Sequence, residues 1–159
     1  MKVLIVSDTH GHNKDLERVL DKVKPIDALI HCGDVEGEED YIAAIADCPT
    51  YIVAGNNDYF SNLDRELEFE LGGKRIWLTH GHYYGVSMGN ERILEEGRGR
   101  RVDLVMFGHT HRPCIEQYDD ITLLNPGSLP YPRQQGRKSS FMILDIDKNN
   151  IAHYTIKYL

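Results

Sequence analysis

The sequence predicts an α/β protein in which two packed mixed β-sheets are flanked by helices. In the first half of the chain, short apolar runs alternate with helix-like segments, which is the pattern of parallel strands joined by crossover helices. In the second half, apolar runs follow one another through turn residues, which indicates hairpins and a larger share of sheet. The length of 159 residues is near the usual size of one domain, so a single domain is expected over residues 1–159.

Three strands and two helices are expected in the first half of the chain. The strands are the apolar runs at residues 2–7, 27–33 and 50–55. The helices are the segments at residues 13–24 and 38–47. Asn13 is expected to cap the first helix and Pro25 to stop it, because asparagine accepts hydrogen bonds from a first helical turn and proline cannot continue a helix.

The second half is expected to hold hairpins, one helix and a buried strand. Residues 65–81 form a hairpin around Gly72 and Gly73, and residues 140–159 form a closing hairpin that turns at Asn149 and Asn150. Between these hairpins we expect, in order, a helix at 90–99, a buried strand at 103–108, and two strands at 114–118 and 121–125.

Composition excludes several classes of protein. The formal net charge of −7 argues against a general binder of nucleic acids or anionic membranes. The N-terminal apolar segment is too short for a signal peptide, and no apolar run approaches the ~20 residues that span a bilayer, so the cytoplasm is the expected location. The 3 cysteines lack a CxxC spacing and are expected to be reduced, mostly buried thiols.

Polar residues follow five of the apolar runs, each time beside a glycine. These strand ends read SDTHGH, HCGDVEG, AGNND, LTHGH and FGHTH. The carboxyl ends of parallel strands lie along one edge of a sheet, where ligands usually bind. Residues that are distant in sequence are therefore expected to meet there, and Gly108 is expected to let the chain turn just before His109.

The polar residues at these ends form a donor set without thiolates. They are Asp8, His10, Asp34, Asn56, His80, His109 and His111. Carboxylate, imidazole and carboxamide donors suit manganese, iron, zinc and similar divalent ions better than calcium or a thiolate-bound structural zinc. Seven donors exceed what one tetrahedral ion takes, so two ions that share a bridging carboxylate are expected.

The blocks DTHG, GDVEG, GNND, THGH and GHTH, in this order, resemble the signature of the calcineurin-like metallophosphoesterase superfamily. The segments IHCGD, GNND and NPGS are most similar to those of the small bacterial and archaeal phosphodiesterases of the YfcE type. These phosphodiesterases also resemble a retromer scaffold subunit. The resemblance implies one metal at Asp8, His10, Asp34 and His111. It implies a second metal at Asp34, Asn56, His80 and His109, with Asp34 as the bridge. Manganese is the expected ion, with zinc, nickel, iron or cobalt as alternatives.

Two cations of this kind lower the pKa of a bridging water, and the resulting hydroxide attacks the phosphate ester. The expected function is therefore hydrolysis of a small phosphodiester, in which Asp34 and His80 take part as metal ligands. Many members of the superfamily have a histidine where this chain has Asn57, which can bind the phosphate but cannot give up a proton. His12 or His82 is the expected substitute proton donor.

Several other positions have two readings. Arg133 either steers the phosphorylated substrate or is solvated surface. Asp58 either orients a ligand or caps a helix. His31, inside an apolar strand, is expected to be structural, and the NPGS segment is expected to position the site rather than bind metal.

Two alternative functions remain open at this level. A nuclease is disfavoured by the acidic charge, and neither extended nucleic acid nor a membrane is an expected partner. A non-catalytic scaffold of the retromer-subunit type is disfavoured by the complete donor set, although Asn57 keeps it open. Self-association is also left open by the sequence.

Overall fold

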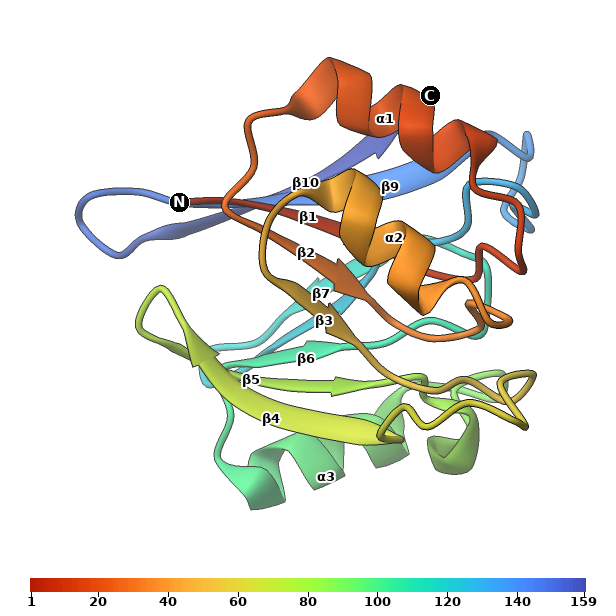
Figure 1. Ribbon diagram of the computed structural model, residues 1–159. Helices are drawn as coiled ribbons and strands as arrows, with labels where there is room; N and C mark the ends of the chain where they lie inside the picture. Colours follow the sequence, from red (N-terminus) through yellow and green to blue (C-terminus); the bar gives the residue numbers. More distant parts are fainter.

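Two five-stranded β-sheets pack face to face in the computed structural model, which describes residues 1–159 (Figure 1). The first sheet contains β1 (Lys2–Val6), β2 (Ala28–His31), β3 (Thr50–Ile52), β9 (Ser140–Ile146) and β10 (Ala152–Tyr158), in the order β10-β9-β1-β2-β3. The second contains β4 (Glu66–Leu71), β5 (Lys74–Thr79), β6 (Leu104–Met106), β7 (Cys114–Gln117) and β8 (Thr122–Asn125), in the order β4-β5-β6-β8-β7. The predicted architecture of two mixed sheets is confirmed.

Three α-helices cover the outer faces of the sheets (Figure 1). They are α1 (Lys14–Val23), α2 (Glu39–Ala46) and α3 (Glu91–Arg100). Apolar residues of α1 and α2 pack on the outer face of the first sheet, and those of α3 pack on the outer face of the second. A short 3-10 helix, η1 (His82–Tyr84), follows β5. None of the helices combines the length and the apolar character that crossing a membrane requires.

The main core lies between the two sheets. Val3 and Ile5 of β1 point at the second sheet, while the residues next to them in the strand point to the opposite face. Leu78 and Met106 of the second sheet belong to the same buried cluster as Val3 and Ile5. Burial on both faces explains why the central strands read as continuous apolar runs rather than as alternating ones.

The parallel pairs place the strand ends that the sequence singled out. β1 pairs in parallel with β2, and β2 with β3. In the second sheet β5 pairs in parallel with β6, and β6 with β8. The carboxyl ends of these strands therefore lie together in each sheet, and the packing of the sheets brings the two sets of ends to one side of the molecule.

Two local expectations need correction. The strands expected at 27–33 and 50–55 end earlier, at His31 and Ile52, because the residues beyond them leave the ladder to form the loops of the site. Asn13 occupies the N-cap position of α1, but its side chain makes no capping hydrogen bond and instead donates from Nδ2 to Glu38 over 3.3 Å. The helix does stop at Val23, just before Pro25.

Candidate metal centre

The seven donors reach one side of the molecule from five strand ends. Asp8 and His10 follow β1, Asp34 follows β2, Asn56 follows β3, His80 follows β5, and His109 and His111 follow β6. The first sheet thus supplies four donors and the second sheet three. The structure brings all of them together, and the carboxylates of Asp8 and Asp34 each lie within 4.0 Å of both His10 and His80.

The first group contains Asp8, His10 and His111. His111 Nε2 lies 3.2 Å from Asp8 Oδ1 and 3.3 Å from His10 Nε2. His10 Nε2 lies 3.7 Å from Asp34 Oδ2. These atoms are close enough to one another to hold a single ion between them.

The second group is centred on the side-chain oxygen of Asn56. This Oδ1 lies 2.9 Å from His80 Nε2 and 2.8 Å from His109 Nδ1. His80 Nε2 is also 3.5 Å from Asp34 Oδ2, the same oxygen that faces His10. The carboxylate of Asp34 therefore stands between the two groups. Asp8 does so as well, since its Oδ1 lies 4.0 Å from His10 Nε2 and 3.8 Å from His80 Nε2.

Three of the imidazoles are held so that their Nε2 atoms face the centre. The Nδ1 atoms of His80 and His111 each lie 2.7 Å from a backbone carbonyl oxygen, that of Cys32 or Tyr131, and a carbonyl can only accept. The Nδ1 atom of His10 lies 2.7 Å from the carboxylate of Glu36. Nδ1 therefore carries a proton in each ring, and Nε2 is the atom turned toward the centre, as in histidines that bind a metal.

Asp8 carries an unsatisfied buried oxygen. Its Oδ2 accepts hydrogen bonds from Ser7 Oγ and from the backbone N–H of His109, whereas its Oδ1 is buried and accepts none. The nearest group is His111 Nε2, which lies 3.2 Å from this oxygen. Burial of an unpaired carboxylate oxygen is costly, and a cation between these atoms would remove that cost. The residues present therefore fit divalent ions.

Electrostatics keep both buried carboxylates ionised. Burial raises the pKa of Asp8, but His111 and His80 outweigh that effect and hold the pKa below its ordinary value. Burial also raises the pKa of Asp34, and there His80 and the hydrogen bonds from Asn57 lower it well below the usual range. Ionised carboxylates are the form that binds a cation.

Five of the seven donors have a left-handed backbone, which is uncommon for residues other than glycine. The φ angles of Asp8, His10, Asp34, His109 and His111 lie between 45° and 67°. Such conformations persist only where surrounding structure enforces them, and they concentrate at functional sites.

Asp58 enforces part of this geometry. Its carboxylate accepts hydrogen bonds from the backbone N–H groups of Asp34, Glu36 and Gly55 at 2.8, 2.7 and 2.7 Å. Asp58 therefore fixes the loops after β2 and β3 against each other, and the alternative that it caps a helix is wrong.

The NPGS segment fixes the loops on the other side. Asn125 Nδ2 donates to the backbone oxygen of Gly108 over 2.9 Å, and its Oδ1 accepts from Gly127 N. Ser128 Oγ donates to the backbone oxygen of Asp8 over 2.9 Å. These contacts are positioning contacts, as the sequence predicted for this segment.

Two glycines are required by space. A Cβ atom on Gly55 would lie 2.1 Å from Asp34 Oδ1, and one on Gly108 would lie 2.0 Å from Ser7 Oγ. The expected reason for Gly108 was wrong, because it has no positive φ and the left-handed turn is made by His109 instead. Gly108 is small because the loop after β1 passes directly against it.

Asn57, His12 and Arg133 lie at the margins of the donor cluster. The backbone N and the side-chain Nδ2 of Asn57 donate to the two carboxylate oxygens of Asp34, each over 2.8 Å. His12 lies 3.2 Å from the hydroxyl of Tyr131. His12 and Arg133 line one cavity of about 1010 Å³ together with His10 and His111, which we call the metal-side cavity.

Two further histidines are placed by their surroundings. His31 is fully buried, accepts a hydrogen bond from Gly33 N at Nδ1 and bonds Thr9 Oγ1 through Nε2, so it is structural, as predicted. His82 packs on His80 with their ring centroids 5.3 Å apart, and burial lowers its pKa to about 4.

Sequence reasoning missed Glu36 and the full role of Asp58. Glu36 lies two residues after Asp34, in the same loop, and its acidic character close to a predicted ligand was the available signal. The arginines of α3 lie away from the donors, since Arg98 pairs with Asp120 and Arg100 with Glu96 on the outer side of the second sheet.

Comparison with known proteins identifies relatives over nearly the whole chain. The family model described as the calcineurin-like phosphoesterase superfamily domain matches residues 1–149. The chain is 32% identical over 150 residues to the probable metallophosphoesterase YsnB of Bacillus subtilis, covering 94% of this chain and 86% of that protein. It is 30% identical over 171 residues to the phosphodiesterase YfcE of Escherichia coli, covering 92% and 89% of the two.

Solved structures share the fold. A predicted phosphoesterase from Streptococcus pneumoniae matches with a TM-score of 0.80 at 25% identity, over 99% of this chain and 97% of that one. Vps29 from Entamoeba histolytica, crystallised with zinc, matches with a TM-score of 0.78 at 23% identity, over 99% of each chain. The likeness to Vps29 concerns the fold alone.

Proposed function

Because the chain belongs to the calcineurin-like phosphoesterase superfamily, we propose that it is a phosphodiesterase that hydrolyses small phosphate esters with the help of two divalent ions. The observation that carries the proposal is the buried Oδ1 of Asp8, which has no hydrogen-bond partner and lies 3.2 Å from His111 Nε2. Without a cation at this site, burial of the charged oxygen costs free energy that no hydrogen bond to it offsets.

The proposed ligands fall into two groups. One ion is held by Asp8, His10, Asp34 and His111, and the other by Asp34, Asn56, His80 and His109. When bound, two such ions lower the pKa of a shared water, bind phosphoryl oxygens and offset the charge that develops during displacement. Manganese is our proposed ion, since the donors are nitrogen and oxygen, with zinc, nickel, iron and cobalt as alternatives.

The side chains around the ligands have separate tasks. Asn57 fixes the carboxylate of Asp34 through one amide hydrogen, and we propose that its other amide hydrogen contacts a phosphoryl oxygen. Arg133 attracts the anionic ester into the metal-side cavity. Hydrolysis adds one water, breaks the bond between phosphorus and the leaving oxygen, and requires a proton on that oxygen, which His12 supplies.

The test uses purified protein loaded with manganese, nickel or zinc. The expected result is two ions per chain and faster hydrolysis of bis(p-nitrophenyl) phosphate than of p-nitrophenyl phosphate. Asp34→Asn should lose both ions and nearly all activity, whereas Asp21→Asn, an exposed carboxylate on α1, should behave as the parent. An Asp34→Asn protein that keeps both ions and full rate would show that the bridging assignment is wrong.

The same experiment separates the alternatives. If the protein holds two ions but hydrolyses neither ester, the phosphodiesterase proposal fails and a scaffold role is favoured. If long DNA is cleaved faster than the small diester, the nuclease alternative is favoured. The net charge of −7 makes that second outcome unexpected.

A further inference from the structure

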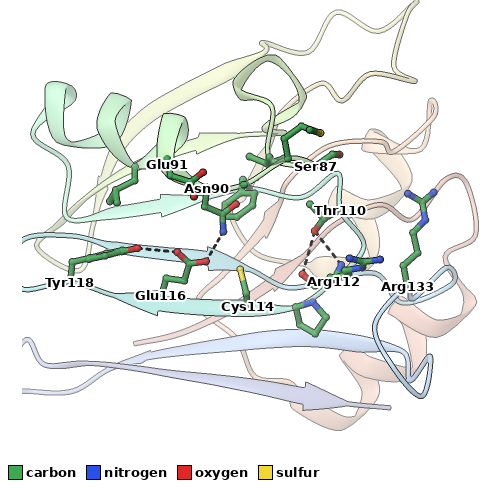
Figure 2. Close-up of a pocket in the computed structure, with 15 residues that line it drawn as sticks. Ser87, Asn90, Glu91, Thr110, Arg112, Cys114, Glu116, Tyr118 and Arg133 are labelled. Atoms are coloured by element: carbon green, nitrogen blue, oxygen red, sulfur yellow. Dashed lines mark hydrogen bonds between the residues drawn. The ribbon is translucent and has the colours of Figure 1, made fainter.

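A second pocket lies beside the metal centre, on the side of the second sheet (Figure 2). We call it the lateral pocket and define it by Asn90, Phe107, Thr110, Arg112, Glu116 and Arg133, which stand on its different walls. Its volume of about 630 Å³ lies in the range of pockets that bind small organic ligands.

The lateral pocket adjoins the donors directly. Thr110 lies in the chain between the proposed ligands His109 and His111. Arg112 and Arg133 line both the lateral pocket and the metal-side cavity, and the backbone N–H of Arg133 donates to the carbonyl of His111 over 3.0 Å. If an ester is bound at the donors and its organic half reaches into the lateral pocket, that half must therefore lie beside these two arginines.

The two arginines are free to bind an anion. Both are exposed, and neither forms an ion pair with a carboxylate, unlike Arg98 and Arg100, which pair with acidic residues. Figure 2 shows Arg112 and Arg133 at the end of the pocket where Thr110 lies, and Glu116 and Tyr118 toward the other end. Guanidinium groups bind phosphate oxygens through paired, charge-assisted hydrogen bonds.

The other end of the pocket suits a group that donates hydrogen bonds. The carboxylate of Glu116 accepts from Asn90 Nδ2 at 2.6 Å and from Tyr118 Oη at 3.2 Å, which fixes it and leaves lone pairs free for a ligand. Leu94 and Phe107 add apolar surface to the lining. A phosphate would be repelled here, whereas a ring with N–H or O–H groups at its edge would be accepted.

We propose that the lateral pocket binds the organic half of the ester and that Arg112 and Arg133 bind a second phosphate carried by that half. The preferred substrate is then a nucleotide-type phosphodiester with a phosphate in addition to the one that is hydrolysed. This inference rests on the proposed function, because it takes the metal centre as the place where the other phosphate is cleaved.

The kinetic test uses two substrates that differ by one phosphate. They are thymidine 5′-(p-nitrophenyl phosphate) and the same diester with a 3′-phosphate. The manganese-loaded parent protein is expected to show a kcat/KM about tenfold higher for the phosphorylated ester, as charge-assisted hydrogen bonds predict. Changing both Arg112→Gln and Arg133→Gln should bring this ratio close to one.

Arg137→Gln is the matched control, because Arg137 lines the metal-side cavity but not the lateral pocket. It should keep the preference for the phosphorylated ester. A ratio near one in the parent protein, or an equal loss of the preference in Arg137→Gln, would overturn the proposed phosphate subsite.

A binding test separates this inference from the proposed function. Calorimetry with the manganese-loaded protein compares thymidine 3′,5′-bisphosphate with thymidine 5′-monophosphate. We expect the parent to bind the bisphosphate about tenfold more tightly than the monophosphate. The double arginine variant should bind the two ligands with equal affinity. If this holds and no ester is hydrolysed, the subsite stands and the proposed function fails; equal affinities in the parent remove the subsite whatever the activity.

The organic end of the pocket has its own variant. Glu116→Gln should weaken both thymidine nucleotides by a similar factor in calorimetry and leave the preference for the bisphosphate intact. Unchanged affinity for both ligands would show that the organic half does not lie against Glu116. The urea midpoint of the variant, measured in the same buffer, separates lost binding from lost folding.

Discussion

The side chain of Asn57 donates a hydrogen bond from Nδ2 to Oδ2 of Asp34 over 2.8 Å. This oxygen is the one that faces both His10 and His80. Asn57 therefore orients the carboxylate at the middle of the donor cluster, a task that does not require a proton to be transferred. At the position where a histidine is common in the superfamily, this chain therefore has an asparagine that makes a defined contact with Asp34.

Asn57→Ala should lower metal affinity about tenfold or more, because partners that orient a ligand have effects of this size. Titration of the metal-free protein with manganese, followed by calorimetry, measures the change. Asn62→Ala, an exposed asparagine in the same connection, is the matched control and should bind as the parent. Equal affinities for parent and Asn57→Ala would show that the hydrogen bond to Asp34 does not support metal binding.

Gly55→Ala should destabilise the protein by about 1–3 kcal/mol, because its new Cβ meets a carboxylate and backbone atoms that cannot move apart. Gly99→Ala, in α3, should have the opposite sign: nothing lies within 4 Å of its Cβ, and alanine favours a helix by about 1 kcal/mol. Urea denaturation in EDTA measures both changes. Equal effects of the two substitutions would contradict the assignment of Gly55 to a close approach.

Asp8→Asn should lower the stability far more with metal than without it. In EDTA the amide removes a buried charge, but it also removes the attraction that His80 and His111 exert on the ionised carboxylate. These two effects oppose each other, so in EDTA we expect the stabilities of the variant and the parent to lie within about 1 kcal/mol of each other.

With manganese at about 100 times its dissociation constant, each bound ion should add about 2.7 kcal/mol to the stability of the parent, and Asp8→Asn should lose the gain from the ion that Asp8 holds. Thermal unfolding with and without metal measures both shifts. An equal gain in the variant and in the parent would show that Asp8 does not hold an ion.

His31 should make stability depend on pH. Burial lowers its pKa to about 4 in the folded protein, below the unfolded value of about 6.5. Between these values the unfolded chain binds a proton that the folded chain does not. The free energy of unfolding should therefore fall by about 3 kcal/mol as the pH drops from 6.5 to 4.

His31→Gln removes this titration, so its stability should fall less steeply over the same range. Urea denaturation in EDTA at several pH values compares the two slopes, which makes the basal cost of the substitution irrelevant. Parallel curves for His31→Gln and the parent would contradict the assignment.

His12→Gln should affect esters according to their leaving groups. A phenyl diester needs a proton on its leaving oxygen and should be hydrolysed at least about 100-fold more slowly, whereas a p-nitrophenyl diester should lose little. His82→Gln is the control, because the pKa of about 4 leaves His82 without a proton to donate at neutral pH. Equal losses on both esters would remove His12 as the proton donor.

Much of the fold could be predicted from the sequence because the chain is locally consistent. The run KVLIVS is buried on both faces, and the turn residues at Gly72, Gly73, Asn149 and Asn150 stand where the hairpins turn. The donors could be found because each follows an apolar strand, so that topology alone brings them to the same edge.

The contacts between loops could not be predicted in this way. Asp58 accepts hydrogen bonds from four backbone groups, and Glu36 pairs with His10. Both contacts depend on how two loops pass each other, which the periodicity of apolar residues does not indicate. The same holds for the lateral pocket, which joins Asn90 at the start of α3 to Glu116 of β7, 26 residues apart.

The division of donors between the sheets gives the metal centre a mechanical consequence. Asp8, His10, Asn56 and Asp34 belong to the first sheet, and His80, His109 and His111 to the second. Ions bound as we propose would link the two sheets at the edge opposite the hairpin turns. The two sheets should then separate only after the ions leave, so that hydrogen exchange in β1 and in β6 slows together when metal is added.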